Sequence, residues 1–391
     1  MHRCTRRSFV KGGALALVAL GAAPRFVVRT ALAQSRAARS KVLVVLFQRG
    51  AVDGLSMLVP HGDPDYYAAR GSIAIGRPAA TEGAVDLDGF FGLHPALAPL
   101  MPLWREGALA VAQAVATPYR GKRSHFDGQD LLEAGGSDPG EIRDGWLNRA
   151  LALIPGAEAE TALSVGRASM LLLRGEAPTR AWSPGDRLRL QNDERGLLDR
   201  LYADDPLFLR ALQAAEGLAA LDGGAEVEGE DPIARFAGQR LAAEARIAAF
   251  SIGGWDTHVG QAKAIVPPLR RLAQAIVTLR AATGPAWDST LVVAMTEFGR
   301  TARENGSGGT DHGTGGAALL AGGAVRGGRV YGDWPGLGEG ALFQDRDLMP
   351  TIDVRCYPAL ALAALFGLDR RAIERDVFPG LDMGAAPQFI A

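Results

Sequence analysis

The sequence has little cysteine, and this scarcity excludes two classes of protein. The chain of 391 residues contains only Cys4 and Cys356. Cys4 falls in an N-terminal segment that we expect to be removed, so the remaining chain would keep one thiol and no internal disulfide. Cys356 lies in an apolar stretch and is best interpreted as a small buried hydrophobe. Because no Cys-x-x-Cys pair is present, zinc-ribbon and thioredoxin-like proteins are excluded.

An excess of positive charge is also missing. The formal net charge is −1, and residues 1–33 hold six basic residues and no acidic one, so the rest of the chain has 36 basic against 43 acidic residues. A mildly acidic protein lacks the basic surface that nucleic-acid binding requires. We therefore expect no nucleic-acid partner, and for the same reason no basic face that binds a membrane.

Long apolar runs and several familiar motifs are absent as well. No segment after the N-terminal region approaches the roughly 20 apolar residues that span a bilayer, so we expect no stable membrane anchor. No G-x-S-x-G elbow, P-loop or G-x-G-x-x-G motif follows a predicted strand. The sequence therefore gives no support for a lipase, a nucleotide hydrolase or a dehydrogenase.

The N-terminal region has the pattern of a twin-arginine signal peptide. Thr5–Lys11 (TRRSFVK) follows the twin-arginine consensus, a short apolar run covers Ala14–Ala23, and Ala31–Ala33 forms a small-x-small cleavage site. An accidental basic and apolar N-terminus would have to produce all three features together. We expect residues 1–33 to be a signal peptide that the twin-arginine translocase recognises, and the mature protein to be periplasmic or secreted. Such export carries folded proteins, so metal loading could finish in the cytoplasm.

The mature chain alternates between apolar strand-like runs and helical patterns. Strands are predicted at residues 41–47, 108–115, 162–165, 246–252, 289–296 and 316–321, and helices at 95–105, 191–218, 261–282 and 358–368. Strands that alternate with helices predict an α/β fold, with a doubly wound, mostly parallel sheet and helices on both faces. We expect a single domain over residues 41–391, in which 145–240 could form a helical insertion or cap.

Polar residues follow several of the predicted strands. In open parallel sheets, ligands bind beyond the carboxyl ends of the strands. The candidates at these ends are Asp53, Arg120, Ser124, His125, Asp256, His258, Glu297, Arg300, Asp311 and His312. Imidazole and carboxylate groups together are the usual ligands of zinc or a comparable divalent ion. Arginine at the same edge would suit a phosphate or sulfate group.

Each candidate also has an ordinary structural interpretation. Asp53 could shape a turn before Gly54, and Ser124 could cap a helix that follows it. Asp256, Thr257 and His258 could cap the helix that begins near residue 261. Glu297 is either a ligand or the ion-pair partner of Arg300.

Eight motifs resemble those of the bacterial, twin-arginine-exported family known as domain of unknown function 1501. They are RGAVDGLSMLVP (49–60), GFFGLHPALAPL (89–100), PYRGKRSHFDGQDLLEAG (118–135), GGWDTH (253–258), TEFGRT (296–301), GGTDHGTGG (308–316), VRGGRVYGDWPGL (325–337) and VFPG (377–380). The family in turn resembles the alkaline phosphatase and sulfatase superfamily, whose members hydrolyse phosphate or sulfate esters with one or two metal ions. This resemblance implies an alkaline-phosphatase-like fold.

The resemblance also implies roles for individual residues. Asp53, Asp256, His258, Glu297 and His312 match metal-binding positions, and Ser124 lies in the segment of the nucleophile. Asp311-His312 could instead be the Asp-His pair that the superfamily has where this chain has Glu297-Phe298.

The sequence thus predicts an exported, metal-dependent hydrolase of a small phosphate or sulfate ester. The expected metal ligands are Asp53, Asp256, His258, Glu297, Asp311 and His312, and the expected catalytic residues are Ser124, His125, Arg120 and Arg300. The metal could be zinc, calcium, manganese or magnesium. The alternative is a non-catalytic binding or assembly protein on a degenerate hydrolase scaffold.

Overall fold

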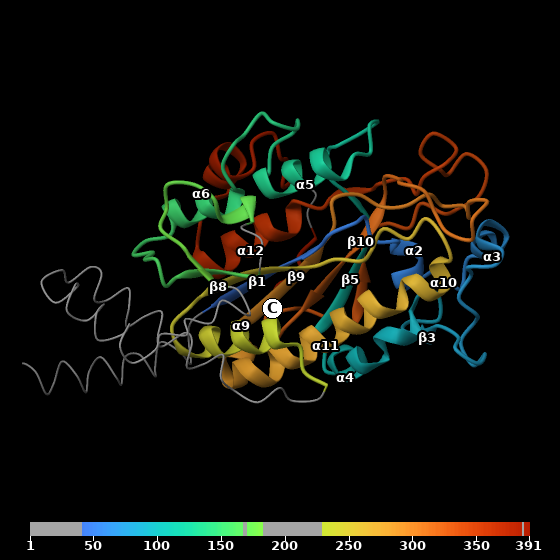
Figure 1. Ribbon diagram of the computed structural model, residues 1–391, viewed down its shortest axis with the longest axis horizontal. Helices are drawn as coiled ribbons and strands as arrows, with labels where there is room; N and C mark the ends of the chain where they lie inside the picture. The colour runs from blue at the N-terminus through green and yellow to red at the C-terminus, as the bar shows by residue number, and fades with distance from the viewer. Residues whose placement is uncertain (1–40, 167–169, 183–228, 385–386) are drawn as a thin grey trace, which may run out of the picture. The chain divides into compact units, whose positions relative to one another are not determined.

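The apolar run Val42–Gln48 forms strand β1, which is buried along its whole length in the middle of a nine-stranded sheet (Figure 1). The structure is a computed structural model that describes residues 41–166, 170–182, 229–384 and 387–391. Lys41–Ala391 form one compact unit. A run of β-branched and other apolar residues suits a strand that is covered on both faces.

The sheet has the order β11-β5-β10-β9-β1-β8-β6-β7, with β12 also paired to β5. The other strands are β5 (Leu109–Ala116), β6 (Ala162–Val165), β7 (Arg180–Trp182), β8 (Ile247–Ile252), β9 (Thr290–Met295), β10 (Gly316–Ala321), β11 (Arg329–Tyr331) and β12 (Ile352–Asp353). All six predicted strands are confirmed. Most pairs are parallel, but β10 runs antiparallel to both of its neighbours, β5 and β9. The sheet is therefore mixed, and mostly parallel.

Alternate residues of β1 pack into two separate core layers, because successive side chains of a strand point to opposite faces. Val42, Val44 and Leu46 belong to one layer, and Leu43 and Val45 to the other. The first layer is covered by η1 (Pro95–Leu100), α4 (Met101–Arg105), α9 (Pro232–Ala243) and α11 (Val266–Thr283), and the second by α5 (His125–Ala134), α6 (Trp146–Leu153) and α12 (Cys356–Phe366) (Figure 1). The prediction of helices on both faces is confirmed.

Short elements complete the described part of the chain. A second, three-stranded sheet consists of β2 (Leu58–Val59), β4 (Gly92–Leu93) and β3 (Val85–Asp86). The remaining helices are α2 (Gly54–Met57), α3 (Pro64–Arg70), η2 (Leu171–Leu173), α10 (Gln261–Ala264), η3 (Gly284–Ser289), α13 (Arg370–Ala372) and η4 (Ile373–Val377).

The described parts of the region 145–240, where a helical insertion or cap was predicted, contain helices α6 and α9 and strands β6 and β7. Strands β6 and β7 extend the central sheet beyond β8, and α9 packs against α11. These residues are part of the main layers because their apolar side chains complete the same two cores. The helix predicted at 191–218 lies outside the described residues.

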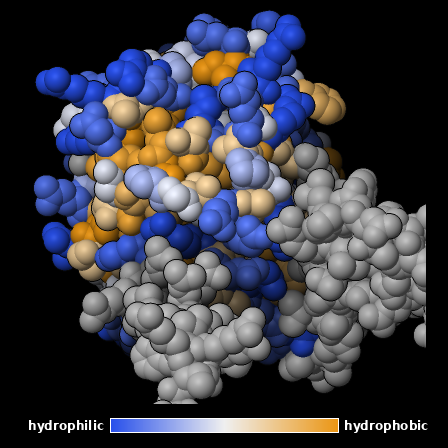
Figure 2. Space-filling view, turned by 90° about the vertical axis from the view of Figure 1, so that its left-hand side faces the viewer, coloured by the Kyte–Doolittle hydropathy of each residue, from blue (hydrophilic) through white to orange (hydrophobic). Residues whose placement is uncertain are grey.

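The surface exposes few large hydrophobic side chains. Figure 2 shows the side of α6 and α9, where an apolar area is bordered by hydrophilic side chains. Among the described residues, the exposed large hydrophobic side chains are Phe126, Val259 and Val277. No helix in the described ranges is long and apolar enough to cross a membrane.

Two loops at one edge of the sheet pack backbone against backbone. The amide of Gly299, after β9, donates to the carbonyl of Thr314 at 3.0 Å, and the amide of Gly313 donates back to Gly299 at 2.8 Å. A Cβ atom on Gly299 would lie 1.9 Å from the carbonyl oxygen of Gly315. Only glycine permits this approach, and it joins the loop after β9 to the loop before β10.

We predict that Gly299→Ala lowers the free energy of unfolding by about 1–3 kcal/mol or more, because the added methyl group forces the two loops apart. Gly306 is the matched control: it lies in the same loop region, and a Cβ atom there would meet nothing within 4 Å. Gly306→Ala should change the stability by less than about 0.5 kcal/mol. Urea denaturation measures both values, and equal stabilities for the two variants would contradict the packing argument.

Candidate metal centre

The topology brings five predicted site residues to one edge of the sheet. Strands β1, β8 and β9 are parallel, and β5 shares their direction because both β5 and β9 are antiparallel to β10. His125 therefore follows β5, Asp256 and His258 follow β8, and Glu297 follows β9 at the same edge. His312 reaches this edge by a different route, because it precedes the antiparallel strand β10.

Nitrogen atoms of three histidines surround one carboxylate oxygen, Oδ1 of Asp256. His258 Nε2 lies 3.0 Å from it, His312 Nε2 3.2 Å and His125 Nε2 3.4 Å. The Nε2 atoms of His258 and His312 are 2.9 Å apart. Tetrahedral zinc, with bonds of about 2.0–2.1 Å, places its ligand atoms about 3.3 Å from one another. Asp256 Oδ1, His258 Nε2 and His312 Nε2 are thus spaced as the ligands of a single ion would be.

Each of the three imidazoles has its other nitrogen, Nδ1, beside an oxygen atom. The pairs are His125 with Glu297 Oε1 (2.9 Å), His312 with the carbonyl of Arg123 (2.8 Å) and His258 with Asp311 Oδ1 (3.5 Å). Carboxylates and carbonyls accept hydrogen bonds, so Nδ1 carries the proton in each ring and Nε2 keeps its lone pair. Outer oxygens orient metal-binding histidines in this way.

The donor set fits a bound cation. Lone pairs and a carboxylate oxygen held this close repel one another, and a cation between them would relieve the repulsion that Arg300 offsets in part. Nε2 of His125 is buried and has no hydrogen-bond partner, and it faces the centre 3.4 Å from Asp256 Oδ1. The ligand atoms of His125, Asp256 and His312 all lie within 4.8 Å of one another. Asp311, predicted as a ligand, is instead the outer partner of His258.

Arg300 controls the charge and position of Asp256. Its buried guanidinium donates to Asp256 Oδ1 and to the carbonyls of Ala51 (2.8 Å), Gly50 (2.8 Å) and Thr310 (3.0 Å). Partial burial raises the pKa of Asp256, but the hydrogen bond and charge of Arg300 lower it to about 2. This geometry does not support the predicted contact of Arg300 with a substrate, because its donors are committed to the protein.

Glu297 is an orienting group behind the centre. Its buried carboxylate accepts from the amide of Gly50 (2.9 Å), from Gln129 Nε2 (3.0 Å), from Thr296 Oγ1 (2.8 Å) and from His125. Burial alone raises its pKa, but the hydrogen bonds from His125 and Gln129 more than offset this effect and keep the pKa below its ordinary value. The sequence predicted that Glu297 is either a metal ligand or the ion-pair partner of Arg300. In the structure it instead orients His125 through a hydrogen bond.

Asp53 lies outside the group of ligand atoms, so its predicted role as a ligand is also corrected. Oδ1 accepts from the amides of Leu55 (3.0 Å) and Ser56 (3.1 Å), which caps helix α2. Oδ2 accepts from the buried Arg70 at 2.5 Å and from Gln261. Asp53 therefore shapes the turn before helix α2, as the structural interpretation of the sequence had it, and it also forms a buried ion pair with Arg70.

Ser124 and Arg120 serve the local backbone. The hydroxyl of Ser124 accepts from the amide of Asp127 at 3.5 Å and caps helix α5. Arg120 donates to the carbonyls of Thr117 and Tyr119. Neither side chain forms a contact with the metal-centre residues in the described part of the chain, so the geometry does not support the catalytic roles predicted for them.

The structure adds residues that the sequence did not point out. Gln129 shares a face of α5 with His125, four residues earlier, and this helical spacing could have revealed it. Phe298 packs against His125 and His312 with ring centroids 5.1 Å apart in both cases. No sequence pattern around Arg70 indicated a role for it, because the tertiary structure alone brings it to Asp53.

Fold and site together define an α/β protein with a histidine–aspartate centre at one edge of a mixed sheet. The chain belongs to the family described as "Protein of unknown function (DUF1501)", which it matches over residues 123–375. None of the curated proteins matches it. Among solved structures it is similar to the C-terminal periplasmic domain of EcEptC from Escherichia coli, with 12% identity and a TM-score of 0.39 over 88% of this chain and 87% of that one.

We predict that Asp53→Asn destabilises the protein by roughly 3–5 kcal/mol at neutral pH, because it leaves the charge of Arg70 buried without its partner. Burial raises the pKa of Asp53, but Arg70 and the other hydrogen-bond donors lower it by a larger amount. The pKa in the folded protein therefore lies below the ordinary value. The stabilisation is therefore present above the ordinary carboxyl pKa of about 4 and is lost as the pH falls through the lowered value.

Urea denaturation at several pH values measures the difference between wild type and Asp53→Asn. The difference should shrink below about pH 4, where the carboxyl begins to take up a proton in the unfolded state while it stays charged in the folded one. Asp144→Asn is the control, because Asp144 pairs with Arg149 at the surface and its loss should cost no more than about 1 kcal/mol. A difference for Asp53→Asn as small as that of the control would refute the structural role.

Proposed function

We propose that this protein is an exported, metal-dependent hydrolase that acts on a small phosphate or sulfate ester. The observation that carries the proposal is the convergence of three oriented Nε2 atoms on Oδ1 of Asp256. Such a donor set suits a cation, and a metal ion in this position would activate water and stabilise negative charge on an ester. The ester class follows from the family resemblance.

We assign the ion to Asp256, His258 and His312, whose donor atoms lie within 3.2 Å of one another. Three protein ligands leave an open position, as in catalytic zinc sites. Nitrogen donors favour zinc over calcium and magnesium, which prefer oxygen ligands. Manganese is the second choice, since it binds both nitrogen and oxygen ligands but binds them less tightly than zinc does.

His125 is assigned to proton transfer. Glu297 holds its Nδ1 proton, which leaves Nε2 free to accept a proton, in the way a carboxylate orients a catalytic histidine. The hydrogen bond that His125 donates to Glu297 raises the pKa of His125, against the opposing effect of partial burial. Nε2 would take a proton from water as the water oxygen attacks phosphorus or sulfur and the ester bond breaks, and the leaving oxygen would be protonated in turn.

The start of helix α5 would receive the negative charge of the substrate. His125 is the first residue of this ten-residue helix, so the positive end of the helix dipole lies beside the centre. Helix N-termini favour phosphate and sulfate through this dipole and through free amide groups. This role replaces the one that the sequence suggested for Arg120 and Arg300.

The test combines metal analysis of the purified protein with turnover of aryl phosphate, aryl phosphodiester and aryl sulfate. We expect about one zinc per chain, and we expect His312→Ala to lose it. His125→Ala should keep the metal and lose roughly 10²–10⁴-fold in turnover. Glu297→Gln should keep the metal with turnover reduced about 10–100-fold. His61→Gln is the control, because His61 pairs with Asp86 away from the centre.

Two results would contradict this assignment in different ways. A protein without metal and without turnover, after exposure to zinc and manganese, would refute the hydrolase. Loss of metal from His125→Ala would make His125 a fourth ligand and close the site. That outcome would favour the second candidate, a non-catalytic binding protein, which is motivated by Ser124 and Arg300 being committed to structural contacts.

Export is part of the proposal and has its own test. The motif around Arg6 and Arg7 supports recognition by the twin-arginine translocase. Replacing both with lysine should leave the protein in the cytoplasm, as measured by fractionation of cells that produce it. Unchanged export of the Arg6→Lys, Arg7→Lys variant would refute this route.

A further inference from the structure

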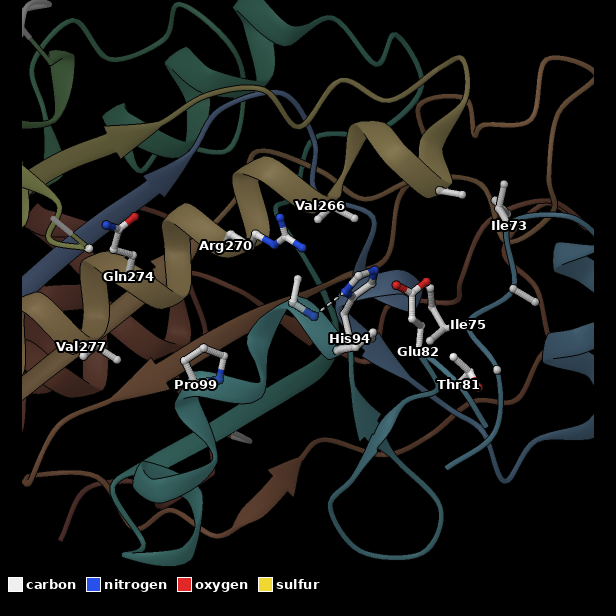
Figure 3. Close-up of a pocket in the computed structure, with 16 residues that line it drawn as sticks. Ile73, Ile75, Thr81, Glu82, His94, Pro99, Val266, Arg270, Gln274 and Val277 are labelled. Carbon is white, nitrogen blue, oxygen red and sulfur yellow. Dashed lines mark hydrogen bonds between the residues drawn. The ribbon is translucent and has the colours of Figure 1, made fainter. Parts of the chain in front are cut away.

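A second hollow lies outside the metal centre. Its volume is about 690 Å³, within the range of about 300–1,000 Å³ that small-molecule sites occupy. Figure 3 shows side chains from helix α11, from η1 and from the loop of residues 73–82 around it. None of its lining residues belongs to the metal centre, so a ligand bound here would occupy a second, separate site.

Two opposite charges face this cavity. Arg270 comes from α11 and Glu82 from the loop (Figure 3). Neither side chain forms a hydrogen bond or an ion pair with another residue in the described ranges, and the two do not pair with each other. Among the described residues, none therefore competes with a ligand for either charge. Gln274, one turn along α11 from Arg270, adds an amide to the same wall.

His94 places a neutral donor between these charges. The residue is only 4% exposed, and its Nδ1 accepts a hydrogen bond from the amide of Ala96 at 3.0 Å. The ring proton therefore sits on Nε2. Burial lowers the pKa of His94 to about 4, with a further contribution from the charge of Arg270, so the ring is uncharged at neutral pH.

The rest of the wall is aliphatic. Ile73, Ile75, Val266 and Val277 line the cavity together with alanines, prolines, glycines and Thr81, and no Phe, Tyr or Trp does. Glu82 is held in the loop with a φ of 56°, a left-handed conformation that is uncommon for residues other than glycine. A ligand that fits must combine an aliphatic body with a negative and a positive group.

We propose that this cavity binds a small aliphatic zwitterion, such as a short peptide of aliphatic amino acids, with its carboxylate at Arg270 and its ammonium group at Glu82. The aliphatic side chains would pack against Val266, Val277 and the isoleucines. Complementary charges at the two ends set the direction in which the ligand lies.

Calorimetric titration of the purified protein with leucyl-leucine tests the proposal. Wild type should bind it about tenfold or more tightly than either N-acetyl-leucyl-leucine or leucyl-leucine amide, since a hydrogen bond to a charged group is worth roughly that factor. Glu82→Gln should lose only the discrimination against acetylation, and Arg270→Gln only that against amidation. This pattern pairs each ligand group with one residue.

Lys263→Gln is the matched control, because it removes a positive charge from the neighbouring helix α10 without changing the lining of the cavity. It should bind leucyl-leucine as wild type does. His312→Ala should also bind it normally, which separates this site from the metal centre. Absence of binding to wild type, or binding of decanoate as tight as that of leucyl-leucine, would overturn the proposal, as would equal discrimination in all variants.

Discussion

The centre depends on the orientation of three imidazole rings around one carboxylate oxygen. Each ring donates its Nδ1 proton outward to an oxygen and so presents a lone pair inward. Such an arrangement is unfavourable without positive charge at its middle, and the protein maintains it through groups that are themselves buried. Glu297 fixes His125, and Arg300 fixes Asp256. The hydrogen bonds of the fold therefore hold these groups in an arrangement that could accept a cation.

Burial separates two aspartates that looked alike in the sequence. Asp53 and Asp256 each follow a strand of the sheet by a few residues. Asp53 is 1% exposed and binds Arg70, so its charge is used to hold loops together. The side chain of Asp256 is 47% exposed and faces three imidazoles. The same residue type thus stabilises the fold in one place and defines the site in the other.

Much of the fold could be predicted because long apolar runs have few alternatives. A segment such as Val42–Gln48 must be buried on both faces, so a central strand was expected and found. Strands β7, β11 and β12 have two or three residues, too few to show a periodic pattern. The antiparallel direction of β10 could not be predicted either, since direction depends on pairing with distant strands.

The sequence alone determined which chemistry was available: imidazoles and carboxylates next to the predicted strands, with Asp256, His258 and His312 among the expected ligands. Only the tertiary structure decided which of them meet. Glu297 lies 172 residues from His125, yet holds its ring at 2.9 Å, and the same folding pairs Asp53 with Arg70 instead of with the histidines. The physical reason is that a side chain's role depends on burial and hydrogen-bond partners, and these come from segments far apart in the chain.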